Sequence, residues 1–169
     1  LFIGQPYRGR MTGAWIVPFS RALVEEGRLR GVIVLSVSVA HLTRALRELY
    51  PGTSDVAALV LDDGHFLAHS NRTAGAIGRS VPSDRPYLLD RVALQGNFDA
   101  TAPLDGVERY YAWHRVAGFP VVAALGLSKA DALAPVRGTI RDNRLRSGLG
   151  SLLLFVAALL ISLLWRRHA

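Results

Sequence analysis

The sequence contains no cysteine, a single lysine and no initiating methionine. Without cysteine there is no disulfide scaffold, zinc ribbon, iron–sulfur cluster or cysteine nucleophile. The other 19 of the 20 basic residues are arginine, which we attribute first to genomic base composition. No signal-peptide pattern follows Leu1, so we expect a piece of a longer chain or a processed one.

Motifs for catalysis and for nucleotide binding are also lacking. The sequence has no Gly-x-Ser-x-Gly elbow, no Walker loop and no Gly-x-Gly-x-x-Gly run. His65 and His69 would lie about 13 Å apart on a strand, which is too far for two ligands of one metal ion. We therefore expect no catalytic site, no metal and no cofactor within these residues.

Positive charge is concentrated near the C-terminal end. The formal charge is +7, yet residues 1–134 hold 14 basic and 12 acidic residues. The remaining excess lies on both sides of one apolar run, with Arg166 and Arg167 directly after it. A nucleic-acid-binding protein usually gathers its charge on a folded face. This arrangement instead favours the membrane surface as partner, and no nucleic acid.

Residues 147–165 carry no charge and predict a transmembrane helix, which we place at 149–165. Nineteen residues rise about 28 Å, close to the thickness of the hydrocarbon core. Trp165 would then lie at the headgroup level, with the arginines beyond it in the cytoplasm. The alternative is a buried core helix, but such a helix normally shows a polar stripe.

Hydrophobic periodicity predicts an α+β fold with an antiparallel sheet flanked by helices, the PAS-like arrangement. Turns are expected at residues 25–27 and at Asp62-Asp63-Gly64, a loop at 70–86, a helix at 40–50 and a short helix within 87–94. A further helix should start after Ser128. The expected strands are residues 11–23, 31–39, 56–61, 65–69, 96–101, 107–116 and 120–127.

Several segments, in order and spacing, resemble the double-Cache family of sensors. Residues 4–6, 9–15, 19–21 and 31–34 resemble the closing strands of the membrane-distal lobe. Residues 63–70 resemble the "DG-x-LARS" hairpin of the membrane-proximal lobe, and 105–109 and 120–122 its later strands. The resemblance implies a bacterial inner-membrane protein with a periplasmic sensor lobe. Its relatives signal to a histidine kinase of a two-component system, a diguanylate cyclase or a chemoreceptor domain.

The resemblance also implies a domain organisation. Residues 1–50 would be the end of the distal lobe and a linker helix, and residues 51–134 the proximal lobe. A juxtamembrane helix at 135–148, the transmembrane helix and the start of a cytoplasmic region at 166–169 would follow. A seam of Leu133, Val136, Ile140 and Asn143 predicts a homodimer. The alternatives are a fragment of a membrane-bound signalling enzyme, and a tethered adhesion or assembly domain.

Two residues depart from the family pattern. His69 stands where an arginine is more usual, and Ser38 stands near the aspartate that binds the ligand's amine in amino-acid-binding relatives. An amino acid is therefore not a safe prediction for the ligand.

The strand at 107–116 carries the candidate binding residues. Period two places Arg109, Tyr111, Trp113 and Arg115 on one face, and the loop residues Arg85 and Tyr87 could close over it. Arginine among aromatic rings suits a cavity for a small anion such as a carboxylate. The alternative is that these aromatic side chains pack under a helix and that the arginines are solvated.

The membrane assignment predicts that the chain stays in the pellet when membranes are washed with alkaline carbonate. Peripheral proteins are released by this treatment, whereas a spanning helix is retained by its buried apolar surface. Recovery of the chain in the supernatant would contradict the assignment.

Overall fold

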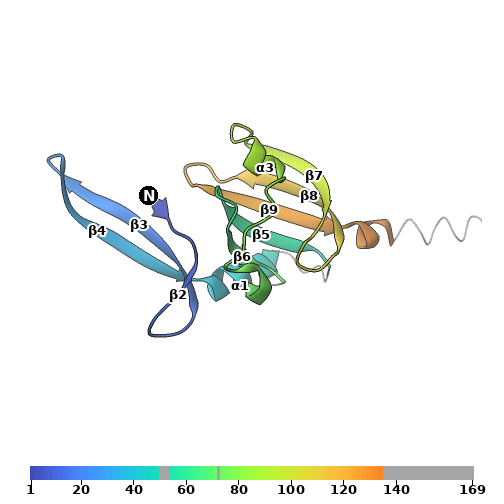
Figure 1. Ribbon diagram of the computed structural model, residues 1–169, viewed down its shortest axis with the longest axis horizontal. Helices are drawn as coiled ribbons and strands as arrows, with labels where there is room; N and C mark the ends of the chain where they lie inside the picture. The colour runs from blue at the N-terminus through green and yellow to red at the C-terminus, as the bar shows by residue number, and fades with distance from the viewer. Residues whose placement is uncertain (50–53, 72, 135–169) are drawn as a thin grey trace, which may run out of the picture. The chain divides into compact units, whose positions relative to one another are not determined.

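The computed structural model describes residues 1–49, 54–71 and 73–134. The chain divides into two units, Leu1–Lys129 and Ala130–Ala169, and the first contains two antiparallel sheets with short helices (Figure 1). This confirms the predicted α+β class. The predicted transmembrane and juxtamembrane helices lie outside the described residues. Within the described ranges, no helix is long and apolar enough to span a bilayer.

The first sheet is built around a long hairpin. Strands β3 (Trp15–Glu25) and β4 (Arg28–Ser38) pair along their whole length, and β1 (Phe2–Ile3) and β2 (Tyr7–Arg8) pair with β3. Glu26 and Gly27 have φ values of 51° and 73°, as a two-residue type I′ turn requires. β3 begins later than predicted because residues 9–14 form a separate turn, closed by the Gly9 N–H donating to the Ala14 carbonyl.

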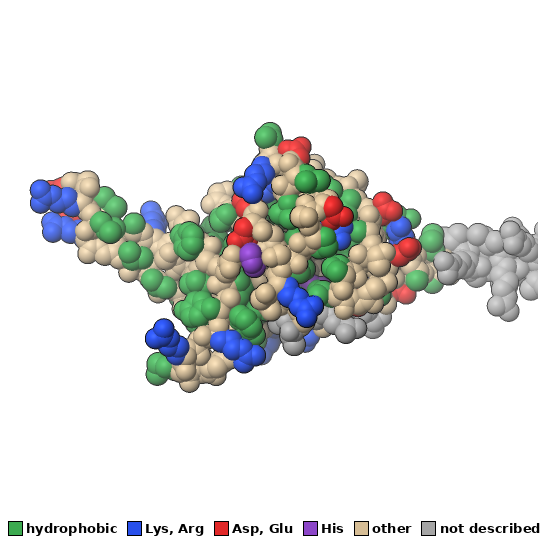
Figure 2. Space-filling view, in the orientation of Figure 1, with side chains coloured by type: hydrophobic (Ala, Val, Ile, Leu, Met, Phe, Trp, Pro, Cys, Tyr) green, Lys and Arg blue, Asp and Glu red, His purple; other side chains and the backbone are tan. Residues whose placement is uncertain are grey.

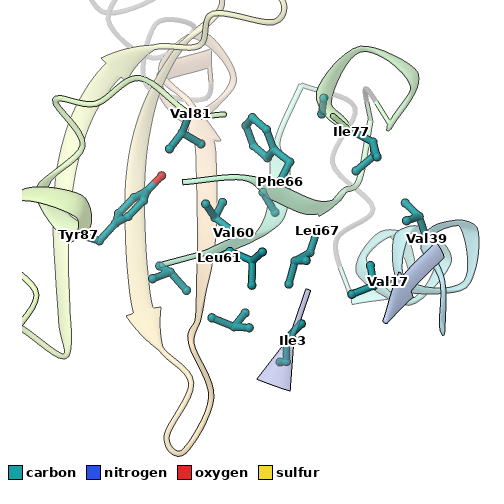
Figure 3. Close-up of a cluster of buried hydrophobic side chains, with 14 of the residues drawn as sticks. Ile3, Val17, Val39, Val60, Leu61, Phe66, Leu67, Ile77, Val81 and Tyr87 are labelled. Carbon is teal, nitrogen blue, oxygen red and sulfur yellow. The ribbon is translucent and has the colours of Figure 1, made fainter. Parts of the chain in front are cut away.

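The hairpin is buried at its base and exposed at its outer half. Ile3, Val17 and Val39 join the main hydrophobic core (Figure 3). Farther out, large apolar side chains are 51% to 66% exposed, and hydrophobic surface follows the hairpin in Figure 2. They are Leu23, Val24, Leu29, Val32, Ile33, Val34 and Leu35. A surface of this kind usually has a partner.

The second sheet holds five strands in the order β6-β5-β9-β8-β7. They agree with the predicted strands to within about two residues, and all pairs are antiparallel. The strands are β5 (Val56–Leu61), β6 (Phe66–His69), β7 (Gln95–Thr101), β8 (Glu108–Arg115) and β9 (Val121–Ser128).

Helices differ more from the prediction. Helix α1 (Val39–Leu49) agrees with it and packs against β5 and β6. Helix α2 (Thr73–Ala76) lies in the segment predicted as a loop. Helix α3 (Pro86–Leu89) is shorter than expected because the Asp90 carboxylate accepts the N–H groups of Val92 and Ala93 in a turn. Residues 129–134 are helical, as expected after Ser128.

The turn between β5 and β6 yields a stability prediction. Gly64 has φ of 92°, and an added Cβ would lie 3.3 Å from Leu88 Cδ1. Gly64→Val should lower the free energy of unfolding by about 1 kcal/mol or more, because a β-branched residue is strained in this conformation. Thermal unfolding of the two proteins measures the effect, and equal melting temperatures would contradict it.

Candidate ligand-binding site

One face of β8 is turned to the protein interior. Arg109 and Trp113 are buried and Tyr111 is half-buried, whereas Tyr110 and Ala112 are exposed. Period two thus places the predicted residues on the covered face of the sheet. Segments between β6 and β7 cover this face: Tyr87 and Val81 reach over the strands toward Phe66 and Val60 (Figure 3).

A cavity of about 50 Å³ lies under this cover. A water molecule occupies about 30 Å³ in the liquid, so the cavity suits a ligand of a few heavy atoms. The cavity is lined by apolar side chains of β5, β6, β9 and the loops, and by four residues with polar groups. The four are His69, Arg85, Tyr87 and Tyr111.

Aromatic rings form one wall of the cavity. Phe98 stacks on Tyr111 with ring centroids 5.0 Å apart, and Tyr87 meets the Trp113 ring edge-on at 5.7 Å. The Tyr111 ring packs closely against Gly126, its neighbour on β9. A Cβ on Gly126 would lie 2.6 Å from the Tyr111 ring, so any larger residue there would displace the ring.

Arg85 brings a positive charge to the cavity. Its guanidinium lies over the Phe98 ring, 5.3 Å from the centroid, and its side chain is 12% exposed. The nearest carboxylate, on Asp84, is 3.6 Å away but 74% exposed, so water screens this ion pair. Arg85 can therefore also attract an anion that enters the cavity.

The two tyrosines stay neutral at physiological pH. Burial raises the pKa of Tyr87 to about 12, although the positive charge of Arg85 opposes the shift. Burial also raises the pKa of Tyr111, against the opposing effect of a hydrogen bond from Arg109. A neutral phenol keeps its O–H, so both tyrosines can donate a hydrogen bond.

Arg109 is held by the protein's own groups and does not line the cavity. Its two terminal nitrogens donate to both carboxylate oxygens of Asp105 at 2.8 and 2.7 Å, and its Nε donates to the Ser54 carbonyl at 2.8 Å. Of the five predicted residues, Arg85, Tyr87 and Tyr111 line the cavity. Arg109 and Trp113 support its wall through Tyr111 and Tyr87.

Two residues beside the site were not among the predicted candidates. His69 lines the cavity, and its Nδ1 accepts the Asn71 N–H at 3.2 Å. Arg115 donates to the Asp62 carboxylate at 2.8 Å and to the carbonyls of Tyr87, Asp90 and Ala93. Arg115 shares the period-two face of Arg109, which was the available sequence signal.

Several solved structures have a fold similar to that of this chain. The extracellular domain of a protein described as a histidine kinase, rpHK1S-Z16, has 21% identity and a TM-score of 0.64, over 79% of this chain and 55% of that one. The Pseudomonas aeruginosa PAO1 amino acid chemoreceptor PctC, whose ligand-binding domain was solved with GABA, has 25% identity and a TM-score of 0.53, over 75% and 55%. The chain has a Cache-type sensor fold.

A third structure agrees. The ligand-binding domain of the Pseudomonas fluorescens chemoreceptor CtaA with L-alanine has 22% identity and a TM-score of 0.52, over 76% of this chain and 54% of that one. The chain thus spans about half the length of each of these domains. No protein-family model and no curated protein matches the sequence. The predicted resemblance to Cache sensors is confirmed by structure.

The buried Arg109–Asp105 pair predicts that the loss of Asp105 destabilises the fold much more than the loss of Asp99, which forms an exposed pair. Asp105→Ala should lower the free energy of unfolding by about 3 kcal/mol or more, because it leaves a buried guanidinium without its counter-ion. Asp99→Ala, the control, removes the exposed partner of Lys129 and should leave the melting temperature nearly unchanged. Equal effects of the two substitutions in thermal unfolding would show that the buried pair is not special.

Proposed function

We propose that this chain is part of an extracytoplasmic sensor and that its cavity binds a small carboxylate. The observation that carries the proposal is the cavity itself, with one guanidinium and two neutral phenols along an apolar wall. Arg85 would supply charge-assisted hydrogen bonds to the carboxylate, and Tyr87 and Tyr111 would supply O–H donors. Arg109 would orient Tyr111, and Trp113 would support Tyr87.

The lining favours a simple carboxylate over an amino acid. Neither aspartate nor glutamate is among the residues that line the cavity, so an ammonium group would find no counter-ion there. The volume of about 50 Å³ also favours acetate or propionate over larger acids. The solved chemoreceptor domains bind L-alanine and GABA, which are also carboxylates, and this supports the chemical class.

We assign the sensing role to residues 51–134 as the membrane-proximal lobe in the periplasm. Residues 1–50 would belong to a distal lobe, whose further strands and helices would cover the apolar hairpin. The signal would pass through residues 135–148 and 149–165, in a homodimer, across the inner membrane. The similar domains come from a histidine kinase and chemoreceptors, so the output would be of one of these kinds.

Calorimetry on the complete 169-residue chain in detergent micelles tests the binding proposal. Sodium acetate and sodium propionate should bind to the wild type, and L-alanine should bind more weakly. Arg85→Gln should lower the affinity for the carboxylate at least about tenfold, the size of a lost hydrogen bond between charged groups.

Arg79→Gln is the matched control. It makes the same chemical change on an exposed side chain of the same connection, so the affinity should stay at the wild-type value. Binding that is equally strong in Arg85→Gln, or no binding of either carboxylate to the wild type, would contradict the proposal.

A further inference from the structure

The turn between β5 and β6 carries two consecutive aspartates with different partners. The Asp62 carboxylate accepts a hydrogen bond from Arg115 at 2.8 Å. The Asp63 carboxylate accepts hydrogen bonds from the Gln5 amide at 2.9 Å and from the backbone N–H of His65 at 3.0 Å. One tight turn is therefore bonded to two distant parts of the chain.

The partner of Asp62 holds the wall of the cavity. Arg115 donates from Nε to the Ala93 carbonyl at 2.9 Å and from Nη2 to the carbonyls of Tyr87 and Asp90. These carbonyls lie within and just after α3, which presents Tyr87 to the cavity. Arg115 thus fixes the covering segment to the sheet, while its charge is balanced by Asp62.

The partner of Asp63 lies in the link between two strands of the four-stranded sheet. Gln5 lies between β1 and β2, next to Gly4, whose N–H donates to the Pro18 carbonyl of β3 at 2.9 Å. Burial raises the pKa of Asp63, but hydrogen bonds from Gln5 and His65 lower it further, so it lies below its usual value. The carboxylate is therefore charged at neutral pH and is a strong acceptor for Gln5.

Packing around Gly64 links the same elements a second time. The Val81 N–H donates to the Gly64 carbonyl at 2.9 Å, and Val81 lines the cavity. In the same segment between β6 and β7, Gly78 lies against the Trp15 ring. An added Cβ on Gly78 would be 3.3 Å from Trp15 Cη2. The connection between β6 and β7 thus contacts the turn at Gly64 and the four-stranded sheet at Trp15.

We infer that Arg115 is a positioning residue for the cavity, and that the Asp62-Asp63 turn couples the cavity wall to the four-stranded sheet. Any ligand that shifts α3 changes the Arg115–Asp62 contact, and Gln5 responds through Asp63. Because coupling is reciprocal, the position of the four-stranded sheet changes the cavity in turn. The use of this coupling by a ligand rests on the proposed function. The coupling between the cavity wall and the four-stranded sheet does not depend on the proposed function.

Hydrogen exchange of the complete chain in detergent micelles, without ligand, tests the coupling. Gln5→Ala should raise the exchange rate of the α3 amides of Leu89 and Asp90 by about threefold to tenfold, the effect of one lost hydrogen bond passed through the turn. Arg30→Ala is the control, because it breaks an exposed ion pair with Glu25 in the same sheet without touching the turn. It should leave the α3 amides at their wild-type rates.

Coupling from the cavity wall to the four-stranded sheet is tested with Arg115→Lys. Lysine keeps the positive charge beside Asp62 but lacks the planar guanidinium that donates to three carbonyls. The exchange rate of Gly4, bonded to Pro18, should rise together with those of the α3 amides. Arg91→Lys makes the same change on an exposed side chain and should alter neither.

The exchange rates decide the inference. Unchanged α3 exchange in Gln5→Ala would overturn it, and so would equal acceleration of the buried β9 amides, since that reports a loss of global stability. Distant acceleration with unchanged β9 supports it. If acetate and propionate fail to bind while the exchange is coupled, the proposed function is wrong and the coupling stands. If they bind while the exchange is uncoupled, the inference fails alone.

Discussion

Two guanidinium groups on the covered face of β8 organise the five-stranded sheet and the segments that cover it. A charge turned to the interior is costly unless it is paired and hydrogen-bonded, so each arginine must bring its partners with it. Arg109 holds Asp105 in the β7–β8 connection and the Ser54 carbonyl before β5. Arg115, at the other end of the strand, holds Asp62 and the carbonyls around α3. The loops that cover the sheet are therefore fixed by electrostatics at both ends of one strand.

Between the two arginines, aromatic rings form the wall of the cavity. The cavity therefore lies beside ring contacts and not beside the ion pairs. The buried ion pairs lose stability if any hydrogen-bonding partner is removed. The rings of Tyr111, Phe98 and Tyr87, in contrast, contact one another only by their faces and edges. Ring contacts contribute about 0.5–1.5 kcal/mol each beyond the area that they bury. A small ligand can rearrange such ring contacts at modest cost.

The sheet was predictable because its signals are local. Apolar runs bounded by turn residues located all five strands of the second sheet, and the Asp-Gly pair located the β5–β6 turn with the positive φ of Gly64. Three of the five candidate site residues line the cavity: Tyr111 on the covered face of β8, and Arg85 and Tyr87 in the segment that covers this face. The role of Arg109 could not be read in the same way. Whether a buried arginine meets a ligand or Asp105 depends on the path of the loop, and the sequence pattern is the same in both cases.

The outer edge of β4 has a practical consequence for work with the isolated chain. Among the described residues β4 pairs with β3 alone, so a row of backbone donors and acceptors faces outward beside apolar side chains. Such an edge accepts a further strand from any chain that offers one, including a second copy at high concentration. We expect concentration-dependent self-association that sedimentation velocity would detect. A single charge on the exposed strand, as in Ile33→Lys, should suppress it and yield a better sample for crystallisation.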